Sequence, residues 1–395
     1  MFTIYKAKVT IAKPVINLVA KPTPVTFIGP GKILKTAELL KMNNIQKALI
    51  VTDDFLYNSG LLSAMLDRIK EEGIEVVIFS QVTPDPTFEV VAKAQDGAQD
   101  CQAVVAVGGG SVLDTAKAVS AAIANHTSAA RLAGMLKVKK RPLPLIAVPT
   151  TAGTGSETTV AAIISDSSTH LKKQILDPKI VPIMAILDPE ITVGLPPHLT
   201  AFTAMDALTH ALEAYVSNYA SEETDRYSEI AIKLIYENLD KVYNNPKDME
   251  GREALLVASF FAGMAFTRTY VGYVHAFAHT IGGKYGYAHG MANAVLLPHI
   301  MREYEVCCKQ RFAKLYDLVT LPSDSLSKEE KARRFVDSIY AMNKRFNIPE
   351  KFEKFPKSDM EMITKIAFKE SHGTYPVPVY FSMKKAKELL EKVSV

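Results

Sequence analysis

Length and composition place the chain among ordinary two-domain globular proteins. It has 395 residues, of which 48% are hydrophobic and 22% charged, with a formal net charge of +4 at pH 7. The small charge and scattered basic residues argue against a nucleic-acid-binding surface. No run of about 18 apolar residues exists, so no membrane span is expected. Three cysteines offer no disulfide framework and the N-terminus lacks a signal-peptide core, so we expect a cytoplasmic protein.

Short apolar runs and amphipathic runs alternate along the first half of the chain. The apolar runs are continuous, which is typical of parallel strands covered on both faces. This alternation predicts an open, doubly wound sheet that binds its ligand at the carboxyl ends of the strands. The expected strands are 25–28, 48–52, 76–80, 103–107 and 145–149, with helices near 31–43, 58–72 and 87–100.

A glycine run follows the expected strand at 103–107. Gly108-Gly109-Gly110-Ser111 leads into a helix that we expect from Val112. Glycines let a backbone approach a phosphate, and a helix N-terminus offers N–H groups and a positive dipole end. Ser111 and Asp114 are also good capping residues. The alternative is a tight turn before a capped helix, since the run is not the Gly-x-Gly-x-x-Gly fingerprint.

Two further strand ends carry polar groups. Asp53 follows the strand at 48–52. A carboxylate at this point binds ribose hydroxyls and repels a 2′-phosphate, so it favours NAD over NADP. The equal alternative is that Asp53 only caps a helix. Residues 149–159 form a Ser/Thr/Gly-rich loop that suits a polar ligand, with an ordinary turn as the alternative. Beyond it, we expect 160–165 and 183–187 to form a β-ribbon that extends the sheet.

The composition changes near residues 188–197. Beyond Pro197 glycine becomes rarer and a period of 3.6 residues takes over, which predicts an α/β domain over 1–194 and an all-helical domain over 195–395. The expected helices of the second domain are 198–217, 222–243, 251–267, 271–284, 288–302, 310–319, 328–345, 357–370 and 382–393.

Several histidines and a carboxylate interrupt these apolar helices. Asp206 and His210 are four residues apart, so they lie on one helical face. His275 and His279 repeat that spacing, and His289 opens the next helix. Unpartnered imidazoles would be costly in such segments, so we predict a four-ligand metal site. Spacing does not decide which of the last three histidines is left over. Glu213 continues the first face and is expected to support the site rather than to bind the metal.

Four motifs together resemble the iron-containing (group III) alcohol dehydrogenases, which have the dehydroquinate-synthase-like fold. The resemblance extends over roughly residues 20 to 390. The motifs are Gly-Gly-Gly-Ser-x-x-Asp at 108–114, Pro-Thr-Thr-Ala-Gly-Thr-Gly-Ser-Glu at 149–157, Asp-Ala-Leu-Thr-His-Ala at 206–211 and His-x-x-x-His-x9-His-Gly at 275–290.

The resemblance implies roles for individual residues. Asp206, His210, His275 and His289 match the metal ligands, and His279 then lies beside the nicotinamide as a candidate catalytic proton relay, or only packs against it. Fe(II) is implied by the family, and Zn(II) also suits these ligands. The residues that match or adjoin the NAD-binding positions are Asp53, Asp85, Gly109, Gly110, Ser111, Asp114, Thr150, Thr151, Thr154, Thr159 and Lys172.

The implied enzyme transfers a hydride between NAD and a small alcohol or aldehyde, in a homodimer or larger homo-oligomer. Two departures from the family concern the cofactor and substrate positions: Asp85 replaces a usual Asn, and Arg268 and Tyr270 stand in a run that usually contains Asn. If Arg268 lines the pocket, an anionic hydroxy acid becomes a plausible substrate. The alternatives are a glycerol-type polyol dehydrogenase, a dehydroquinate-synthase-type lyase that releases no net NADH, or a non-catalytic metal- and nucleotide-binding protein.

Overall fold

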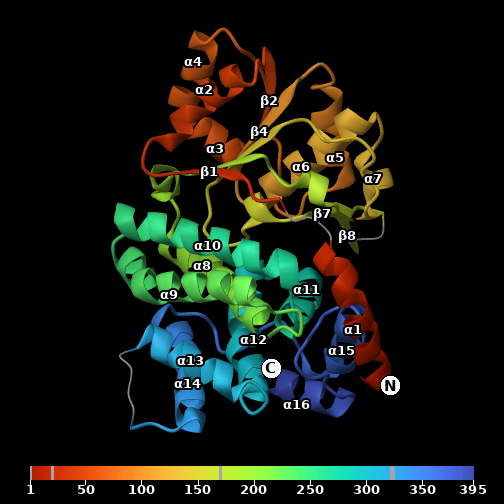
Figure 1. Cartoon of the computed structure of the whole chain (residues 1–395), viewed down its shortest axis with the longest axis vertical. Helices are drawn as coiled ribbons and strands as arrows, with labels where there is room; N and C mark the ends of the chain where they lie inside the picture. Colours follow the sequence, from red (N-terminus) through yellow and green to blue (C-terminus); the bar gives the residue numbers. More distant parts are fainter. Residues whose placement is uncertain (1, 19–21, 169–170, 321–324) are drawn as a thin grey trace. The chain divides into compact units, whose positions relative to one another are not determined.

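Six parallel strands form the sheet of the first half of the chain in the computed structural model, which describes residues 2–18, 22–168, 171–320 and 325–395 (Figure 1). Their order is β1-β9-β6-β4-β2-β3. The chain leaves β2 toward β3 and leaves β4 in the opposite direction toward β6, so the topological switch point lies between β2 and β4. The strands are β1 Val25–Ile28, β2 Lys47–Val51, β3 Glu75–Phe79, β4 Ala103–Gly108, β6 Leu145–Pro149 and β9 Met184–Leu187.

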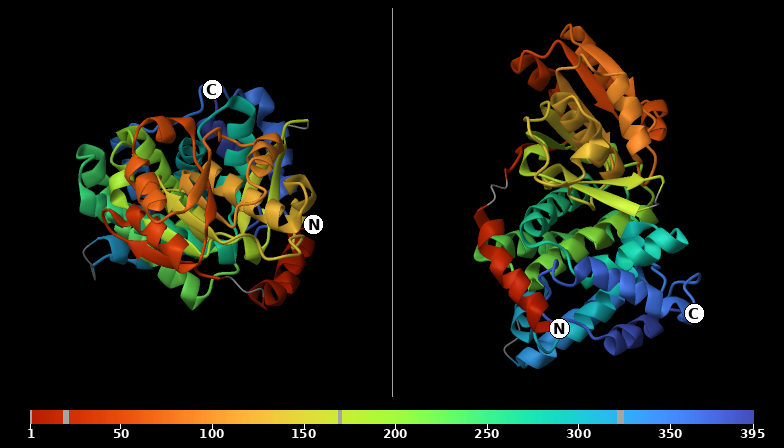
Figure 2. Two further views of the ribbon diagram at one scale, coloured as in Figure 1. Left: turned by 90° about the horizontal axis from the view of Figure 1, so that it is seen from above. Right: turned by 90° about the vertical axis from the view of Figure 1, so that its right-hand side faces the viewer.

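Helices cover both faces of this sheet (Figures 1 and 2). On strand β2, Leu49 and Val51 pack into one core cluster, with residues of α5 (Phe88–Asp96) and α6 (Gly110–Asn125). Ala48 and Ile50 point to the other face, into a cluster with α2 (Lys35–Met42) and α4 (Ser63–Glu71). Successive strand residues face opposite sides, which explains why these strands are apolar at every position. The short helices α3 (Asp54–Asn58) and α7 (Ala129–Leu132) complete the layers.

The expected β-ribbon is wrong in its pairing. β7 (Ala161–Asp166) pairs antiparallel with β8 (Leu171–Leu176), and with β5 (Gly134–Met135) they form a separate three-stranded sheet. β9 lies instead between β1 and β6 in the parallel sheet. Burial accounts for the difference, because β9 is apolar and almost fully buried, whereas β8 carries exposed polar residues, Lys172 and Gln174, that suit a solvated antiparallel strand.

The described residues divide into two compact units, called here the α/β unit and the helical unit. The α/β unit comprises Ala20–Leu195 with Lys247–Phe260, and the helical unit comprises Met1–Val19, Pro196–Pro246 and Phe261–Val395. The fold class expected from the sequence is confirmed. The domain boundary between residues 194 and 195 stays a prediction.

All nine helices expected in the second half are present among the described residues, with bounds shifted by a few residues at most. Their caps explain several ends. Helix α9 begins with a capping box, in which the Ser221 hydroxyl accepts from Thr224 N–H and the Thr224 hydroxyl accepts from Ser221 N–H. The helices are α8 Pro197–Val216, α9 Glu222–Asn244, α10 Met249–Thr269, α11 Tyr273–Tyr285, α12 His289–Tyr304, α13 Lys309–Val319, α14 Lys328–Arg345, α15 Met360–Ser371 and α16 Met383–Val393.

Helix α8 is buried on all sides over most of its length. Proline opens it, and no glycine interrupts it. Every residue from Ala204 to Val216 is buried. A helix without a solvent face is a core helix, so the polar side chains in its centre must find partners inside the unit.

Helix α1 (Phe2–Leu18) was not expected from the sequence. Its first half is rich in β-branched residues, which are poor helix formers. Tertiary contacts within the helical unit account for it. The Tyr219 hydroxyl donates to Val9 O at 2.8 Å, Lys13 Nζ donates to Asn218 O at 2.8 Å, and the Phe2 ring stacks on Tyr380.

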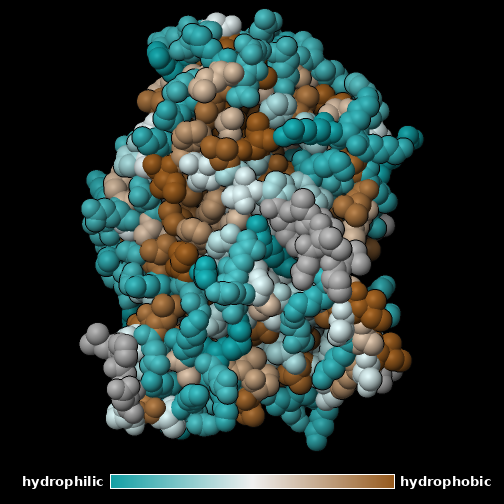
Figure 3. Space-filling view, in the orientation of Figure 1, coloured by the Kyte–Doolittle hydropathy of each residue, from teal (hydrophilic) through white to brown (hydrophobic). Residues whose placement is uncertain are grey.

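Hydrophilic residues are spread over the face seen in Figure 3, with small hydrophobic areas between them. The basic run at residues 137–141 lies outside helices and strands, with Lys139, Lys140 and Arg141 exposed, as expected for a solvated loop. Among the described residues, no single helix combines the length and apolar character of a membrane span. Helices α10 and α11 meet that test only as a pair, and they are bent by 104°.

Candidate functional site

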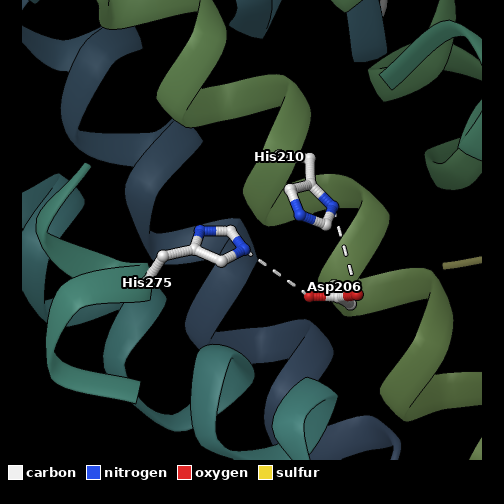
Figure 4. A group of neighbouring side chains, drawn as sticks. All are labelled: Asp206, His210 and His275. Carbon is white, nitrogen blue, oxygen red and sulfur yellow. Dashed lines mark ion pairs between the residues drawn. The ribbon is translucent and has the colours of Figure 1, made fainter. Parts of the chain in front are cut away.

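A carboxylate and two imidazoles converge inside the helical unit (Figure 4). Asp206 and His210 extend from α8, and His275 extends from α11. The distance from Asp206 Oδ2 to His210 Nδ1 is 4.0 Å, and that from Asp206 Oδ1 to His275 Nε2 is 3.8 Å. All three potential ligand atoms lie within 4.8 Å of one another. Metal–ligand bonds to N and O are about 2.0–2.2 Å long, so separations of 3.8 and 4.0 Å are close to the spacing of two ligands on one ion.

His289 adds a fourth nitrogen to this group. It is the first residue of α12, and its Nε2 lies 3.4 Å from Asp206 Oδ1. Its ring centroid is 5.4 Å from that of His275. The side chain is 37% exposed, whereas Asp206 and His275 are almost completely buried. The four predicted ligands therefore come from three helices, and the three imidazoles surround the Asp206 carboxylate, with His210 near Oδ2 and the other two near Oδ1.

Asn293 lies at the point where these atoms converge. Its Nδ2 donates to Asp206 Oδ1 at 2.6 Å, and it lies 3.2 Å from His275 Nε2 and 3.1 Å from His289 Nε2. One electropositive nitrogen thus lies within 3.2 Å of three candidate ligand atoms, an arrangement that also suits a cation. Asn293 was not predicted from the sequence. Its signal is the spacing of four residues from His289 on an apolar helix.

Glu213 fixes the orientation of His275. Its carboxylate accepts from His275 Nδ1 at 2.7 Å and from the backbone N–H groups of Gly272 and Val274, both at 2.7 Å. With Nδ1–H donating, His275 presents the Nε2 lone pair toward Asp206. A Cβ at Gly272 would lie 2.7 Å from Glu213 Oε1, so this close approach requires glycine. The expected supporting position of Glu213 is thus observed.

Burial sets the protonation of this centre. Burial lowers the pKa of His275 well below its usual range, and the nearby His210, His289 and His279 act in the same direction. The imidazole is therefore neutral, which is the form that binds metals. Burial also raises the pKa of Glu213 to about 8, against the opposing effect of its three N–H donors.

His279 lies beside the cluster but has a different partner. Its Nδ1 and Glu370 Oε1 are 2.8 Å apart, and the same oxygen accepts from the Tyr375 hydroxyl at 2.6 Å. The His279 ring stacks on His289 with centroids 5.3 Å apart. Glu370 and Tyr375 were not predicted from the sequence, because they lie about 90 residues beyond His279 in a segment without a recognisable motif.

Arg268 and Tyr270, which depart from the family pattern, have defined contacts in the helical unit. Arg268 lies against α9, with Nε 3.5 Å from Glu223 Oε1 and its guanidinium over the Tyr227 ring. It also donates to Met264 O at 2.8 Å, and the side chain is 11% exposed. Tyr270 has a left-handed φ of 59° and packs edge-on against Tyr219. Within this run, Phe266 touches the metal cluster by stacking on His210, with centroids 4.1 Å apart.

In the α/β unit, the two predicted cofactor loops pack against each other. The Thr150 N–H donates to Gly108 O at 3.0 Å, which joins the ends of β4 and β6. A Cβ at Gly110 would lie 2.7 Å from Thr154 Cγ2, and one at Gly109 would lie 3.5 Å from the Thr151 side chain. Gly110 thus permits close packing as well as ligand approach, whereas a Cβ at Gly109 would make only ordinary van der Waals contact. Gly109 is the N-cap residue of α6, so Ser111 lies in the first turn of that helix at the switch point.

The expected capping role of Ser111 and Asp114 is wrong. Helix α6 begins at Gly110, and its start has no side-chain cap. Asp114 lies inside the helix, where Oδ1 accepts from Ser156 Oγ at 2.6 Å and Oδ2 accepts from Ile163 N–H at 2.9 Å. It therefore ties α6 to the loop at 149–159 and to β7. Whether Asp114 also contacts NAD stays a prediction.

Lys117 is a buried cation that the sequence analysis missed. Its Nζ donates to Ser156 Oγ, to Thr159 Oγ1 and O, and to Ala161 O at 2.8–3.1 Å, and lies 3.9 Å from Asp114 Oδ1. Burial lowers the pKa of Lys117 to about 8. The Thr159 hydroxyl, a predicted cofactor contact, is thus bonded to Lys117. The signal in the sequence is one lysine within a run of small apolar residues.

The remaining predicted cofactor residues lie at strand ends and loops. Asp53 caps α3, with Oδ1 accepting from Leu56 N–H at 2.9 Å, so the helix-cap alternative describes its contact in this structure. It still follows β2 on one side of the switch point, with Gly109 following β4 on the other. Asp85 and Lys172 form an ion pair of 2.6 Å on the surface, and Asp85 has a φ of 54°.

Two family models match the chain, one in each half. The family model described as "Iron-containing alcohol dehydrogenase" matches residues 22–189, and "Fe-containing alcohol dehydrogenase family, C-terminal" matches 200–394. The chain belongs to the iron-containing alcohol dehydrogenase family. The resemblance drawn from the four motifs is confirmed, and the chain is an NAD-dependent, metal-dependent alcohol dehydrogenase.

Individual relatives resemble nearly the whole chain. The NAD-dependent methanol dehydrogenase of Bacillus methanolicus is 39% identical over 351 residues, which is 88% of this chain and 92% of the relative. A crystal structure of 1,3-propanediol oxidoreductase superposes with a TM-score of 0.91 at 33% identity, covering 95% of this chain and 99% of that one. The alcohol dehydrogenase from Oenococcus oeni gives a TM-score of 0.91 at 32% identity, covering 95% and 100%.

Proposed function

We propose that Asp206, His210, His275 and His289 hold a single divalent metal, Fe(II), for the oxidation of a small uncharged primary alcohol or diol by NAD. The observation that carries the proposal is the convergence of the three imidazoles on the Asp206 carboxylate. The chemistry that such a metal supplies is Lewis-acid polarisation of the substrate oxygen. Fe(II) rests on the family description and on the mixed carboxylate and imidazole donors, which Zn(II) also accepts.

The residues around the ligands have separate tasks in this proposal. Glu213 holds His275 in the tautomer that presents Nε2. Asn293 orients the Asp206 carboxylate through its amide N–H. Glu370 accepts from Nδ1 of His279, which leaves Nε2 of that ring as the atom able to exchange a proton.

We assign the proton relay to His279 on these grounds. The expected result is that His279→Ala lowers the rate of alcohol oxidation and alters its pH profile, while metal binding is unchanged. Glu370→Gln weakens the acceptor for His279 Nδ1–H. We therefore expect it to change the pH profile of alcohol oxidation in the same direction as His279→Ala does. An unchanged rate and pH profile in His279→Ala would exclude the relay and leave a packing role.

The sheet topology supports the central cofactor residues of this proposal. Gly109, Gly110 and Ser111 open α6 at the switch point, where N–H groups and the helix dipole suit a diphosphate. Asp53, across that switch point, suits the adenosine ribose. The other proposed contacts are Asp85, Asp114, Thr150, Thr151, Thr154, Thr159 and Lys172.

Two observations bear on the class of substrate. The Arg268 guanidinium contacts Glu223 and Tyr227 on α9, which weighs against an anionic hydroxy acid held by this residue. The relatives' names, a methanol dehydrogenase and 1,3-propanediol dehydrogenases, support small neutral alcohols. We also propose a cytoplasmic homodimer or larger homo-oligomer, as the family resemblance implies.

The test measures NADH formation under anaerobic conditions with ethanol, butanol, 1,2-propanediol and 1,3-propanediol. Metal-stripped protein is reloaded separately with Fe(II) and Zn(II), and metal content is measured alongside activity. His275→Ala is expected to lose both metal and turnover, whereas the control His198→Ala, an exposed histidine of the same unit, keeps both. Metal and NAD binding without net NADH from any alcohol would contradict the proposal and favour the lyase alternative.

A further inference from the structure

Two adjacent cysteines lie in the turn between α12 and α13. Cys307 is exposed and Cys308 is buried, and their Sγ atoms are 3.6 Å apart. Cys307 Sγ also lies 3.3 Å from Tyr304 O. Neighbouring side chains in a chain commonly point apart, so this contact is a specific feature of the turn. It brings a solvent-accessible thiol against a second thiol that solvent barely reaches.

The surroundings of the two sulfurs differ. A hydrogen bond from the Cys308 thiol lowers the pKa of Cys307 to about 7, whereas that bond and burial raise the pKa of Cys308. The thiolate is the reactive form of cysteine. The exposed sulfur therefore has the character of an attacking group and the buried sulfur that of a resolving thiol, which is the arrangement of redox-sensitive pairs.

We propose that Cys307 and Cys308 form a vicinal dithiol that is a modification site for two-electron oxidants of the peroxide class. In the first step the Cys307 thiolate attacks hydrogen peroxide, its sulfur is oxidised to the sulfenic acid and hydroxide leaves. In the second step the Cys308 sulfur attacks Cys307 Sγ, the S–S bond forms and water leaves. Two thiols and one peroxide thus give one disulfide and two waters, with the peroxide reduced.

The product is expected to be easily reduced. A disulfide needs an S–S distance of about 2.05 Å, so the sulfurs must approach from 3.6 Å within a ring that includes one peptide bond. The Cys308 N–H donates to Tyr304 O at 2.8 Å, which holds the turn in its present conformation. Strained and exposed disulfides have the higher reduction potentials of labile, regulatory bonds. A dithiol reagent should therefore reverse the modification.

The same sulfur pair predicts a second ligand. Two thiols in contact suit a soft, trivalent centre that binds both, and phenylarsine oxide is the probe of that chemistry. Cys101 is the matched internal control, because it is buried in the α/β unit and a lone thiol offers only one bond.

The experiment treats the full chain with limiting hydrogen peroxide, alkylates it after unfolding and measures peptide masses. The tryptic peptide that follows Arg302 and ends at Lys309 contains both cysteines of the pair and not Cys101. We expect this peptide to lose two hydrogen atoms in mass, to resist alkylation and to recover both thiols after dithiothreitol. Cys101 should be alkylated throughout.

Variants separate the pair from a single reactive thiol. Phenylarsine oxide is expected to bind wild type and Cys101→Ser with one equivalent, and to lose this binding in Cys307→Ser and in Cys308→Ser. Cys308→Ala, checked by thermal melting, guards against misfolding from a polar side chain at the buried position. Sulfinic acid at Cys307 alone, an intermolecular disulfide through Cys307, or retained arsenical binding in Cys308→Ala would each overturn the proposal.

Discussion

Glu213 shows how much a single residue outside the ligand set contributes. Its carboxylate joins α8 to the start of α11 through the His275 ring and two backbone N–H groups. Partners that orient a ligating histidine commonly change metal affinity by about 10–100-fold when they are removed. The side chain is 1% exposed, so water does not replace it readily.

We therefore predict that Glu213→Gln weakens metal binding by about 10–100-fold, because the amide is a poorer acceptor for Nδ1–H. Competition with a chromogenic chelator measures the affinity directly. Glu237→Gln, an exposed change on α9, is the matched control. Equal metal affinity in Glu213→Gln and wild type would show that His275 needs no such partner.

Gly110 is a second residue whose side-chain size is restricted by its neighbours. A methyl group there would overlap Thr154 Cγ2 at 2.7 Å, and overpacking of this kind costs about 1–3 kcal/mol. We predict that Gly110→Ala weakens NADH binding, measured by fluorescence titration, because relief of the overlap must move the two cofactor loops apart. Gly97→Ala is the control, since its nearest neighbour would be 4.0 Å away.

A double variant tests the cause. Thr154→Ser removes the overlapping Cγ2, so Gly110→Ala with Thr154→Ser should recover part of the lost affinity. If the double variant binds no better than Gly110→Ala, the methyl group acts on the ligand itself and the loop-packing explanation is wrong.

At the level of elements, the loop at 149–159 contains a buried carboxyl group, that of Glu157. Glu157 is 1% exposed, and burial raises its pKa from 4.5 to about 7. Between these two values the folded carboxyl keeps a proton that the unfolded one has lost. The free energy of unfolding therefore falls as pH rises from about 4.5 to about 7 and stays reduced above that range.

Glu157→Gln removes this ionisation. We predict that the variant has a flatter dependence of unfolding free energy on pH between about 4.5 and 7, and that it is more stable than wild type above pH 7. Urea unfolding at several pH values is the measurement. Glu250→Gln, near the start of α10 in the same unit, is the control. A wild-type curve without the fall would mean that Glu157 remains ionised when folded.

The elements differ in how far sequence alone predicts them. Strands such as β4 and helices such as α8 follow from continuous apolar runs, and their bounds were expected within about a residue. The predicted pairing of β7 with β9 was wrong. Which strands pair depends on which of them must be covered on both faces, and that is a property of the whole sheet. Helix α1 was missed because its sequence disfavours a helix, and contacts with residues about 200 positions away stabilise it.

The residues of the candidate site also differ in how far the sequence alone predicts them. Spacing alone brought Asp206 and His210 together and left the choice among three histidines open. The positions of Asn293, Glu370 and Lys117 depend on how helices pack, and polar residues inside apolar helices were the only trace of them in the sequence. Arg268 was considered for the pocket, but its partner Glu223 lies on a different helix and could not be inferred from the local run.

At the scale of the whole molecule, the candidate metal ligands all belong to the helical unit, and the candidate NAD residues all belong to the α/β unit. A ligand that binds only the folded state stabilises it by about 2.7 kcal/mol at a hundred times its dissociation constant. Each ligand should therefore slow local opening first in the unit that holds its residues. Amide hydrogen exchange resolves such effects by segment.

We predict that Fe(II) or Zn(II), added anaerobically to metal-stripped protein, increases exchange protection in α8, α11 and the start of α12. NAD alone should instead protect the start of α6 and the loop at 149–159. His275→Ala should abolish the first pattern and keep the second, while Gly110→Ala should do the reverse. Protection of α8, which carries Asp206 and His210, by NAD without metal would contradict the separate assignment of the two ligands. Protection of the α6 start by metal alone would contradict it equally, since none of the proposed metal ligands belongs to that unit.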